Sequence, residues 1–374
     1  MLSESPFRDV VLLGAGASMA AGLPAAADLT KHLVAARHAL GLSVPPIAVE
    51  LIDQDLAWLK DTQARLYDIR QHLRGFNPEN IEDIFRIWGN ERGSEIQMPG
   101  SRPNLIPGYQ YPRLVRMLAL ALAYSPRYQS MHDLKRPNVY SWLVEQLVGT
   151  VKQGEQYKHA PIVVTTNYDL LIEFAIATRS DVDLTYTYDD YVGLRNIFCR
   201  EHSARCTLHY LKLHGSINWW GERPGFRVSR EAVVNMIISD SPLTAVAERY
   251  DTAGKDIEMV PPDILKDVIY RLIWTDVWDE AYAVFSMCRH LVIIGYSFSQ
   301  GDILVHNMVT LGLARSPCLE SIVVIDPHAN EVLHRIKGYF SDEFISRIEW
   351  IGYEQPFDNN IPQWAMRDMF SGKS

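Results

Sequence analysis

The sequence predicts an α/β protein with a doubly wound, Rossmann-like parallel sheet and a large helical insertion. Short apolar runs rich in β-branched residues alternate with segments of helical periodicity, and this alternation is typical of a parallel sheet covered by helices. A glycine-rich turn, LLGAGAS, follows the first run. Two later apolar runs end in polar residues, in the sequence motifs VVTTNYD and LKLHGS. Open parallel sheets bind ligands at such strand ends.

The predicted elements begin with a strand at residues 10–13, a turn at 14–18 and one helix at 19–39. From 47 to 73, apolar residues recur at helical spacing. Further helices are expected at 81–88, 114–124 and 139–151, with a loop rich in Pro and Gly at 93–111. We therefore predict a helical insertion subdomain at 45–159, flanked by the two parts of a Rossmann-like domain, 1–44 and 160–374.

The alternation of strands and helices resumes after the insertion. Strands are expected at 162–165, 208–213, 291–294 and 322–325. Helices are expected at 168–177, 263–288, 302–314 and 331–336. Residues 217–259 show no clear periodicity, and no element is predicted there.

The composition is that of a globular protein and restricts the classes of function. The formal net charge of −9 over 374 residues argues against direct binding to nucleic acid. The cysteines, Cys199, Cys206, Cys288 and Cys318, form no CxxC pair, so neither a zinc site nor a disulfide framework is predicted. Without an apolar stretch that could span a bilayer, we expect a cytoplasmic protein with no metal and no membrane partner.

The turn after the first strand is a candidate phosphate-binding loop. Gly14 and Gly16 lack Cβ atoms, which lets backbone N–H groups approach a pyrophosphate at the start of a helix. Ala15 lies between them, and Ser18 can cap the helix or contact a phosphate oxygen. Because GAGAS lacks the third glycine of the dinucleotide fingerprint, a tight turn without a ligand is the alternative.

The next two strand ends carry candidate catalytic residues. Thr166 and Asn167 close one apolar run, Asp169 follows two residues later, and His214 closes the other run. An imidazole can act as a base at cellular pH. Asn and Asp are also common helix caps, and a histidine beside an apolar strand is often an ordinary core residue, so both alternatives stay open.

Two later strand ends repeat the pattern. Gly295 and Ser297 follow the predicted strand at 291–294, and the serine can donate to phosphate or ribose oxygens. Asp302 is expected to cap the helix that follows. Asp326 can accept hydrogen bonds from ribose hydroxyls, or it can start the turn before the proline that follows it.

Together these words resemble the sirtuin family, and in particular its bacterial NAD-hydrolysing branch of antiphage systems. The resembling words are GAGAS, AGLP, NIEDIF, TTNYD, LHGS, GYSFSQGD and VVIDP, in family order. The resemblance implies that Asn167 orients a ribose and water, that Asp169 holds the nicotinamide carboxamide, and that His214 is the general base. It implies that NAD, as substrate, contacts these residues: Gly14, Ala15, Gly16, Ser18, Thr166, Asp169, Gly295, Ser297 and Asp326.

Two departures from the family bear on the substrate. Deacylating sirtuins carry a four-cysteine zinc module and a GIPDFR word, whereas this chain lacks that cysteine spacing and reads GLPAAAD. The resemblance therefore implies an NAD+ glycohydrolase that cleaves NAD to nicotinamide and ADP-ribose. The alternatives are a protein deacylase or ADP-ribosyltransferase with the same site, and a non-catalytic subunit that senses a nucleotide.

Because NAD depletion is toxic, such an enzyme is expected to stay inactive until triggered. Homo-oligomerisation or a partner protein would then control it, and related systems imply a HerA-like ATPase or an Argonaute-type protein. The helical insertion and the pair Trp219–Trp220 are candidate contact surfaces, with core packing as the alternative.

Overall fold

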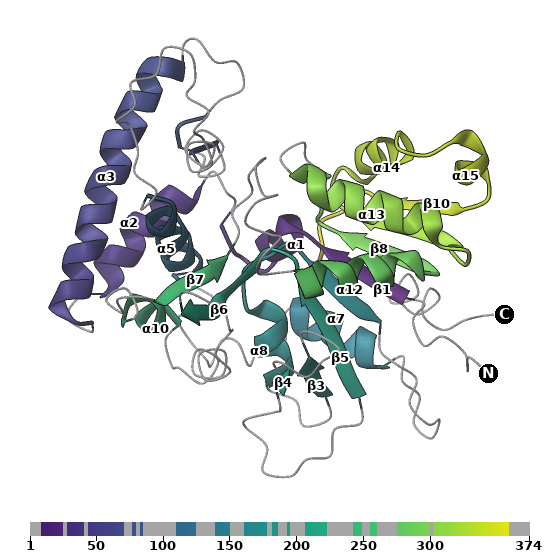
Figure 1. Ribbon diagram of the computed structural model, residues 1–374, viewed down its shortest axis with the longest axis horizontal. Helices are drawn as coiled ribbons and strands as arrows, with labels where there is room; N and C mark the ends of the chain where they lie inside the picture. Colours follow the sequence, from purple (N-terminus) through teal and green to yellow (C-terminus); the bar gives the residue numbers. More distant parts are fainter. Residues whose placement is uncertain are drawn as a thin grey trace. The chain divides into compact units, whose positions relative to one another are not determined.

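The structure, a computed structural model, divides into two compact units, and each is described by itself (Figure 1). The described residues are 9–24, 28–40, 44–70, 77–79, 83–84, 110–124, 139–149, 161–177, 182–185, 193–194, 206–222, 242–248, 255–259, 275–298 and 302–358. Most of the predicted helix at 81–88, nearly all of the predicted loop at 93–111, and Cys199 lie outside them.

The first unit contains residues 1–21, 134–214 and 274–374 and is built on a largely parallel sheet. Its described strands are β1 (Asp9–Leu13), β2 (Ile162–Thr165), β3 (Val182–Thr185), β4 (Gly193–Leu194), β5 (Cys206–Lys212), β8 (His290–Ile294), β9 (Ser321–Ile325) and β10 (Glu349–Tyr353). They lie in the order β10-β9-β8-β1-β2-β5-β3-β4. Every described pair is parallel except β3 with β4.

The direction of winding reverses at β1, which lies between β2 and β8. On one side of β1 lie β2, β5 and β3, which follow it in the chain, and on the other side lie β8, β9 and β10, which come later in the chain. Because crossovers between parallel strands are right-handed, such a reversal sends the connecting helices to opposite faces. The predicted doubly wound, Rossmann-like α/β fold is confirmed.

Helices cover both halves of this sheet (Figure 1). On one half, α8 (Leu171–Ala177) contacts β3 and α7 (Val139–Gly149). On the other, α14 (Ala329–Lys337) contacts β9 and β10, and α12 (Thr275–Ser286) packs on α13 (Ile303–Arg315).

The central strands form because their sequences are continuous apolar runs. In β1, β8 and β9 every residue after the first is buried, as expected for parallel strands covered on both faces. The edge strand β10, EWIGY, has no buried residue. Because these central strands pair in parallel, the carboxyl ends of β1, β2, β5, β8 and β9 lie along one edge of the sheet.

The prediction of a single helix at 19–39 is wrong. The chain instead forms α1 (Ala15–Ala20) and α2 (Leu29–Leu40). Between them Gly22 has a φ of 92°, a left-handed conformation that ends a right-handed helix, and Pro24 disfavours helix in the residue before it. The glycine and proline thus outweigh the apolar periodicity.

No helix within the described residues has the length and apolar character needed to cross a bilayer.

The second unit contains residues 22–133 and 215–273. Its described elements are α2, α3 (Pro46–Arg70), α5 (Gln110–Ala123), β6 (Gly215–Glu222), α10 (Pro242–Glu248) and β7 (Lys255–Met259). The antiparallel pair β6–β7 and the helix α10 lie where no element was predicted. The unit differs in extent from the predicted insertion, 45–159. It adds α2, β6, α10 and β7, because α5 packs against them as well as against α3, whereas residues 134–159 belong to the first unit.

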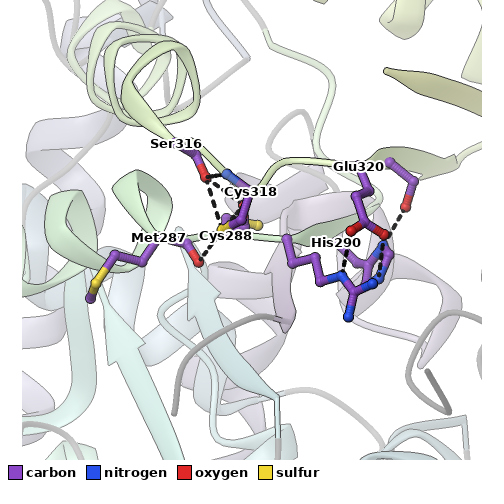
Figure 2. Close-up of polar contacts among 8 residues, drawn as sticks. Met287, Cys288, His290, Ser316, Cys318 and Glu320 are labelled. Carbon is purple, nitrogen blue, oxygen red and sulfur yellow. Dashed lines mark hydrogen bonds and ion pairs between the residues drawn. The ribbon is translucent and has the colours of Figure 1, made fainter. Parts of the chain in front are cut away.

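A polar cluster lies at the amino ends of β8 and β9 (Figure 2). This edge of the sheet is opposite the edge formed by the carboxyl ends of the strands. The Arg289 guanidinium lies 2.7 Å from the Glu320 carboxylate, and the Ser316 hydroxyl donates to the carbonyl of Cys288 at 2.7 Å. Cys288 and Cys318 are free thiols. Burial raises the pKa of the Cys288 thiol well above its ordinary value, so this cysteine is held as a neutral packing residue.

Candidate functional site

The register of β2 with β5 brings the two predicted catalytic residues to one place. Thr165 pairs with Lys212, and the N–H of Leu213 donates to the carbonyl of Thr165 at 2.8 Å. Asn167 and His214 each lie two residues beyond this pair, at the carboxyl end of their strands. Next to Asn167, the ring of Tyr168 lies 5.9 Å from that of His214, tilted by 31°.

The side chain of Asn167 is buried and links β2 to the turn after β1. Its Nδ2 donates to the carbonyl of Gly14 at 2.9 Å and to the hydroxyl of Ser18 at 2.8 Å. Because a backbone carbonyl only accepts, these contacts identify the nitrogen and hence the orientation of the amide. The amide oxygen is then the atom of Asn167 that can accept a hydrogen bond from a water or a ribose hydroxyl.

Ser18 lies at the centre of a buried network rather than at the helix cap. Its hydroxyl donates to Asp169 Oδ2 at 2.5 Å and accepts from Asn167. The hydroxyl of Tyr140 lies 3.1 Å away, and since the one proton of Ser18 goes to Asp169, Tyr140 is the donor there. Burial, and after it the charge of Asp169, raise the pKa of Tyr140 well above its ordinary value, which keeps that donor neutral.

Asp169 connects the site to the first turn of α8. Its Oδ1 accepts from the N–H of Leu171 at 3.0 Å, so Asp169 caps this helix, as the sequence allowed. Its backbone carbonyl accepts from Lys212 Nζ, which also lies 2.9 Å from the Glu173 carboxylate. Lys212 and Glu173 are both fully buried. Asp169 is thus held through both its side chain and its backbone.

His214 faces a carboxylate from the loop after β8. Its Nε2 lies 3.3 Å from Asp302 Oδ1, and both side chains are more than nine-tenths buried. The hydroxyl of Tyr296 donates to the other oxygen, Oδ2, at 3.1 Å. Asp302 stands at the N-cap of α13, but its side chain accepts no hydrogen bond from that helix. The prediction that Asp302 caps the helix is therefore wrong, because the carboxylate turns to His214 instead.

The glycines of the β1–α1 turn serve a close contact between two backbone segments. The N–H of Gly14 donates to Ile294 O at 3.0 Å, and that of Gly16 to Gly295 O at 2.9 Å. A Cβ on Gly14 would lie 2.5 Å from the Cα of Tyr296. Their N–H groups thus donate within the protein, and Ala15, the first residue of α1, is exposed. Contact of this segment with a pyrophosphate stays a prediction.

Gly295→Ala is expected to destabilise the protein by about 2–5 kcal/mol. Gly295 has a φ of +61°, and its Cβ would lie 2.2 Å from the N atom of Ala17, so a left-handed conformation (~1–2 kcal/mol) adds to overpacking (~1–3 kcal/mol). Thermal unfolding measures the loss as a lowered Tm. Gly338→Ala is the control, because its φ is −61° and the nearest atom to its Cβ lies at 3.3 Å. Equal Tm values for the two variants would contradict this account.

The remaining predicted ligand residues lie along the same edge. Thr166 is buried, and its N–H donates to Leu13 O at 3.2 Å. Asp326 Oδ1 accepts from the N–H of His328 at 2.8 Å, which is the turn that the sequence offered as an alternative to ribose binding. Ser297 is exposed, and its carbonyl accepts from Arg335. These residues do not join the network around Asn167.

Sequence reasoning missed Tyr140, Lys212, Glu173 and the contact of Asp302 with His214. The words LKLHGS and GYSFSQGD contain two of these residues, and a lysine inside an apolar strand was the signal that could have pointed to a buried partner. Within the described residues, no group of three or more His, Cys, Asp or Glu side chains is placed to hold a metal.

One family model matches the part of the chain that contains these residues. Residues 161–311 match the family model of the SIR2-like domain. No curated protein matches the chain. A solved mutant of Sir2 homologues in complex with 2′-O-acetyl ADP ribose is 11% identical, covers 96% of this chain and 89% of its own, and has a TM-score of 0.39. A structure described as the basis for the mechanism and regulation of Sir2 enzymes is 12% identical, with coverages of 88% and 90% and a TM-score of 0.34.

At these TM-scores the two solved structures carry no argument about the site. The family-model match extends from the residue before β2 into α13. Asn167, Asp169, His214 and Asp302 therefore lie in a segment that matches the SIR2-like domain.

Proposed function

We propose that this chain is an NAD+ glycohydrolase that cleaves NAD to nicotinamide and ADP-ribose. A SIR2-like domain implies an NAD-dependent enzyme. The observation that carries the proposal is that Asn167 and His214 each follow, by two residues, a paired position of the neighbouring parallel strands β2 and β5, within the segment that matches the SIR2-like domain. An amide and an imidazole at one sheet edge supply an orienting group and a base.

The reaction breaks the bond between ribose C1′ and the pyridinium nitrogen. Nicotinamide leaves as a neutral base with the bonding electron pair, and C1′ becomes oxocarbenium-like. Water then forms the new C1′–O bond and gives up a proton, which His214 accepts directly or through a ribose hydroxyl. The amide oxygen of Asn167 can accept a hydrogen bond from that water or hydroxyl, while its Nδ2 is held by Gly14 and Ser18.

Asp169 is proposed to hold the carboxamide of the leaving nicotinamide. Both carboxylate oxygens already accept one hydrogen bond, from Ser18 and from the N–H of Leu171. A carboxylate offers about four lone-pair sites, so each oxygen retains capacity for the carboxamide N–H groups. Hydrolysis is favoured over acyl transfer because the chain lacks the cysteine module and the GIPDFR word of deacylating sirtuins.

The test is to incubate the purified chain with NAD and to separate the products by chromatography, with His214→Ala as the inactive control. Nicotinamide and ADP-ribose should form in equal amounts without any acceptor. A requirement for an acyl-lysine peptide would indicate a deacylase, and modified protein would indicate an ADP-ribosyltransferase. NAD that binds but persists, even with a cognate partner present, would favour the sensing subunit and overturn the proposal.

We further propose that the enzyme depletes NAD as an abortive-infection effector, controlled by homo-oligomerisation or by a HerA-like ATPase or Argonaute-type partner. The resemblance and the toxicity of NAD loss support this role. Trp219 is buried within the second unit, so it is a poor contact surface, and the side chain of Trp220 lies outside the described residues. Cellular NAD that stays constant during phage challenge, in cells that carry the chain and its genomic neighbours, would refute the role.

A further inference from the structure

We infer that Asp302 positions the imidazole of His214 and determines which ring nitrogen accepts the proton. The role of His214 as the base rests on the proposed function, whereas the pairing of the two side chains does not. Asp302 is a positioning residue in this account, because it acts through His214 rather than on the substrate.

The geometry is that of a carboxylate held against one edge of a histidine ring. Asp302 Oδ1 lies 3.3 Å from His214 Nε2, with the two side chains 8% and 4% exposed. The second oxygen, Oδ2, accepts from Tyr296. A buried carboxylate needs hydrogen-bonding partners. The two partners of Asp302, His214 and Tyr296, follow strands of the sheet, although Asp302 itself precedes the first turn of α13.

The charge of Asp302 selects the tautomer of the neutral ring. A carboxylate only accepts, so it favours a proton on Nε2 and leaves the lone pair on Nδ1. Nδ1 is then the nitrogen that takes a proton during the reaction. The same carboxylate stabilises the imidazolium that forms, as the aspartate does in a Ser-His-Asp triad.

Tyr296 and Phe298, which follow β8, help to hold the Asp302 carboxylate in place. Burial, and then the charge of Asp302, raise the pKa of Tyr296 well above its ordinary value, so its hydroxyl stays a donor. Phe298 has a φ of 51°, unusual for a residue with a side chain. Its buried ring packs 4.8 Å from that of Tyr296 and 5.1 Å from that of His306 in α13, which ties the loop to the helix that Asp302 precedes.

The variant Asp302→Asn tests the inference because it keeps the shape and removes the charge. Its amide can donate to Nε2, which would favour the opposite tautomer, with the proton on Nδ1. We expect kcat for NAD cleavage to fall by about 10²-fold or more, within the range that a general base contributes, while KM changes by less than about threefold. Asp342→Asn, at an exposed position in the first turn of α15 (Asp342–Ser346), is the matched control and should match the wild type.

A second measurement separates this inference from the proposed function. In protein labelled with 15N-histidine, the ring nitrogen shifts report the tautomer, and the His214 signals are identified by their absence in His214→Gln. The wild type should carry its proton on Nε2, and Asp302→Asn should shift the population toward Nδ1. An unchanged tautomer in Asp302→Asn would overturn the inference, whatever the NAD assay shows. If the tautomer changes but the wild type cleaves no NAD, the positioning stands and the proposed function fails.

Discussion

His214→Ala is expected to lower the turnover of NAD by about 10²–10⁴-fold, the range that a positioned general base contributes. The variant removes the nitrogen that accepts the proton of the attacking water or ribose hydroxyl. It also leaves the Asp302 carboxylate without one of its partners, so the free energy of unfolding must be measured in parallel. Steady-state release of nicotinamide measures the effect on turnover.

His209→Ala provides the matched control for this prediction. His209 is on the same strand, β5, but it lies beside Thr185 of β3 in the register, before the strand end. Its removal should leave turnover within about twofold of the wild type, since a general base must be within hydrogen-bond reach of the proton it abstracts. Equal turnover in wild type and His214→Ala, with both proteins folded, would exclude His214 as the base.

Lys212→Met is expected to destabilise the protein by about 3–5 kcal/mol, the cost of leaving one partner of a buried ion pair uncompensated. Lys212 and Glu173 are both fully buried, with Nζ 2.9 Å from the Glu173 carboxylate. The same ammonium donates to the carbonyl of Asp169. Methionine keeps most of the side-chain volume, so the loss reports the charge and its hydrogen bonds. Urea-induced unfolding at pH 7 measures it.

The pH dependence of this loss follows from the carboxylate that remains. Burial raises the pKa of Glu173, and Lys212 opposes that rise, so removing Lys212 raises the pKa further. A carboxyl group with a raised folded-state pKa contributes stability that is present below its unfolded pKa and is lost as the pH rises through the folded value. The destabilisation of Lys212→Met should therefore be small in acid and grow toward neutral pH.

A double-mutant cycle separates charge from packing. Adding Glu173→Leu to Lys212→Met removes the orphaned carboxylate and should recover a large part of the lost stability, because replacing both members of a buried pair is often nearly neutral. Should the double variant be as unstable as Lys212→Met alone, the loss would instead come from packing or from the contact with Asp169.

Much of the sheet could be predicted because its strands are buried on both faces. A continuous apolar run such as DVVLL or SIVVI has one favourable place in an α/β protein, the middle of a parallel sheet. The strand pair β6–β7 was missed because residues 217–259 show no clear periodicity of apolar and polar residues. The break between α1 and α2 was missed because a local glycine conformation, and not periodicity, decides where a helix ends.

In the candidate site, too, some residues could be recognised from the local sequence and others only from the tertiary structure. Asn167 and His214 were recognised because a polar residue at the end of an apolar run is visible locally. Asp302 was interpreted as a helix cap because local sequence shows only that it precedes α13. Its contact with His214 depends on how two loops fold over the sheet edge. Tyr140, far from Ser18 in the chain, likewise joins the network only through tertiary packing.

By itself the sequence determined the fold class, the edge of the sheet that carries polar residues, and the identity of the amide and imidazole there. Hydrophobic burial and strand propensity act over a few residues, so a linear pattern records them. Only the tertiary structure decided how those groups are held: Asp302 against His214, Ser18 between Asn167 and Asp169, and Lys212 against Glu173. Such contacts join side chains from separate strands and loops, and their geometry is set by packing that no local pattern encodes.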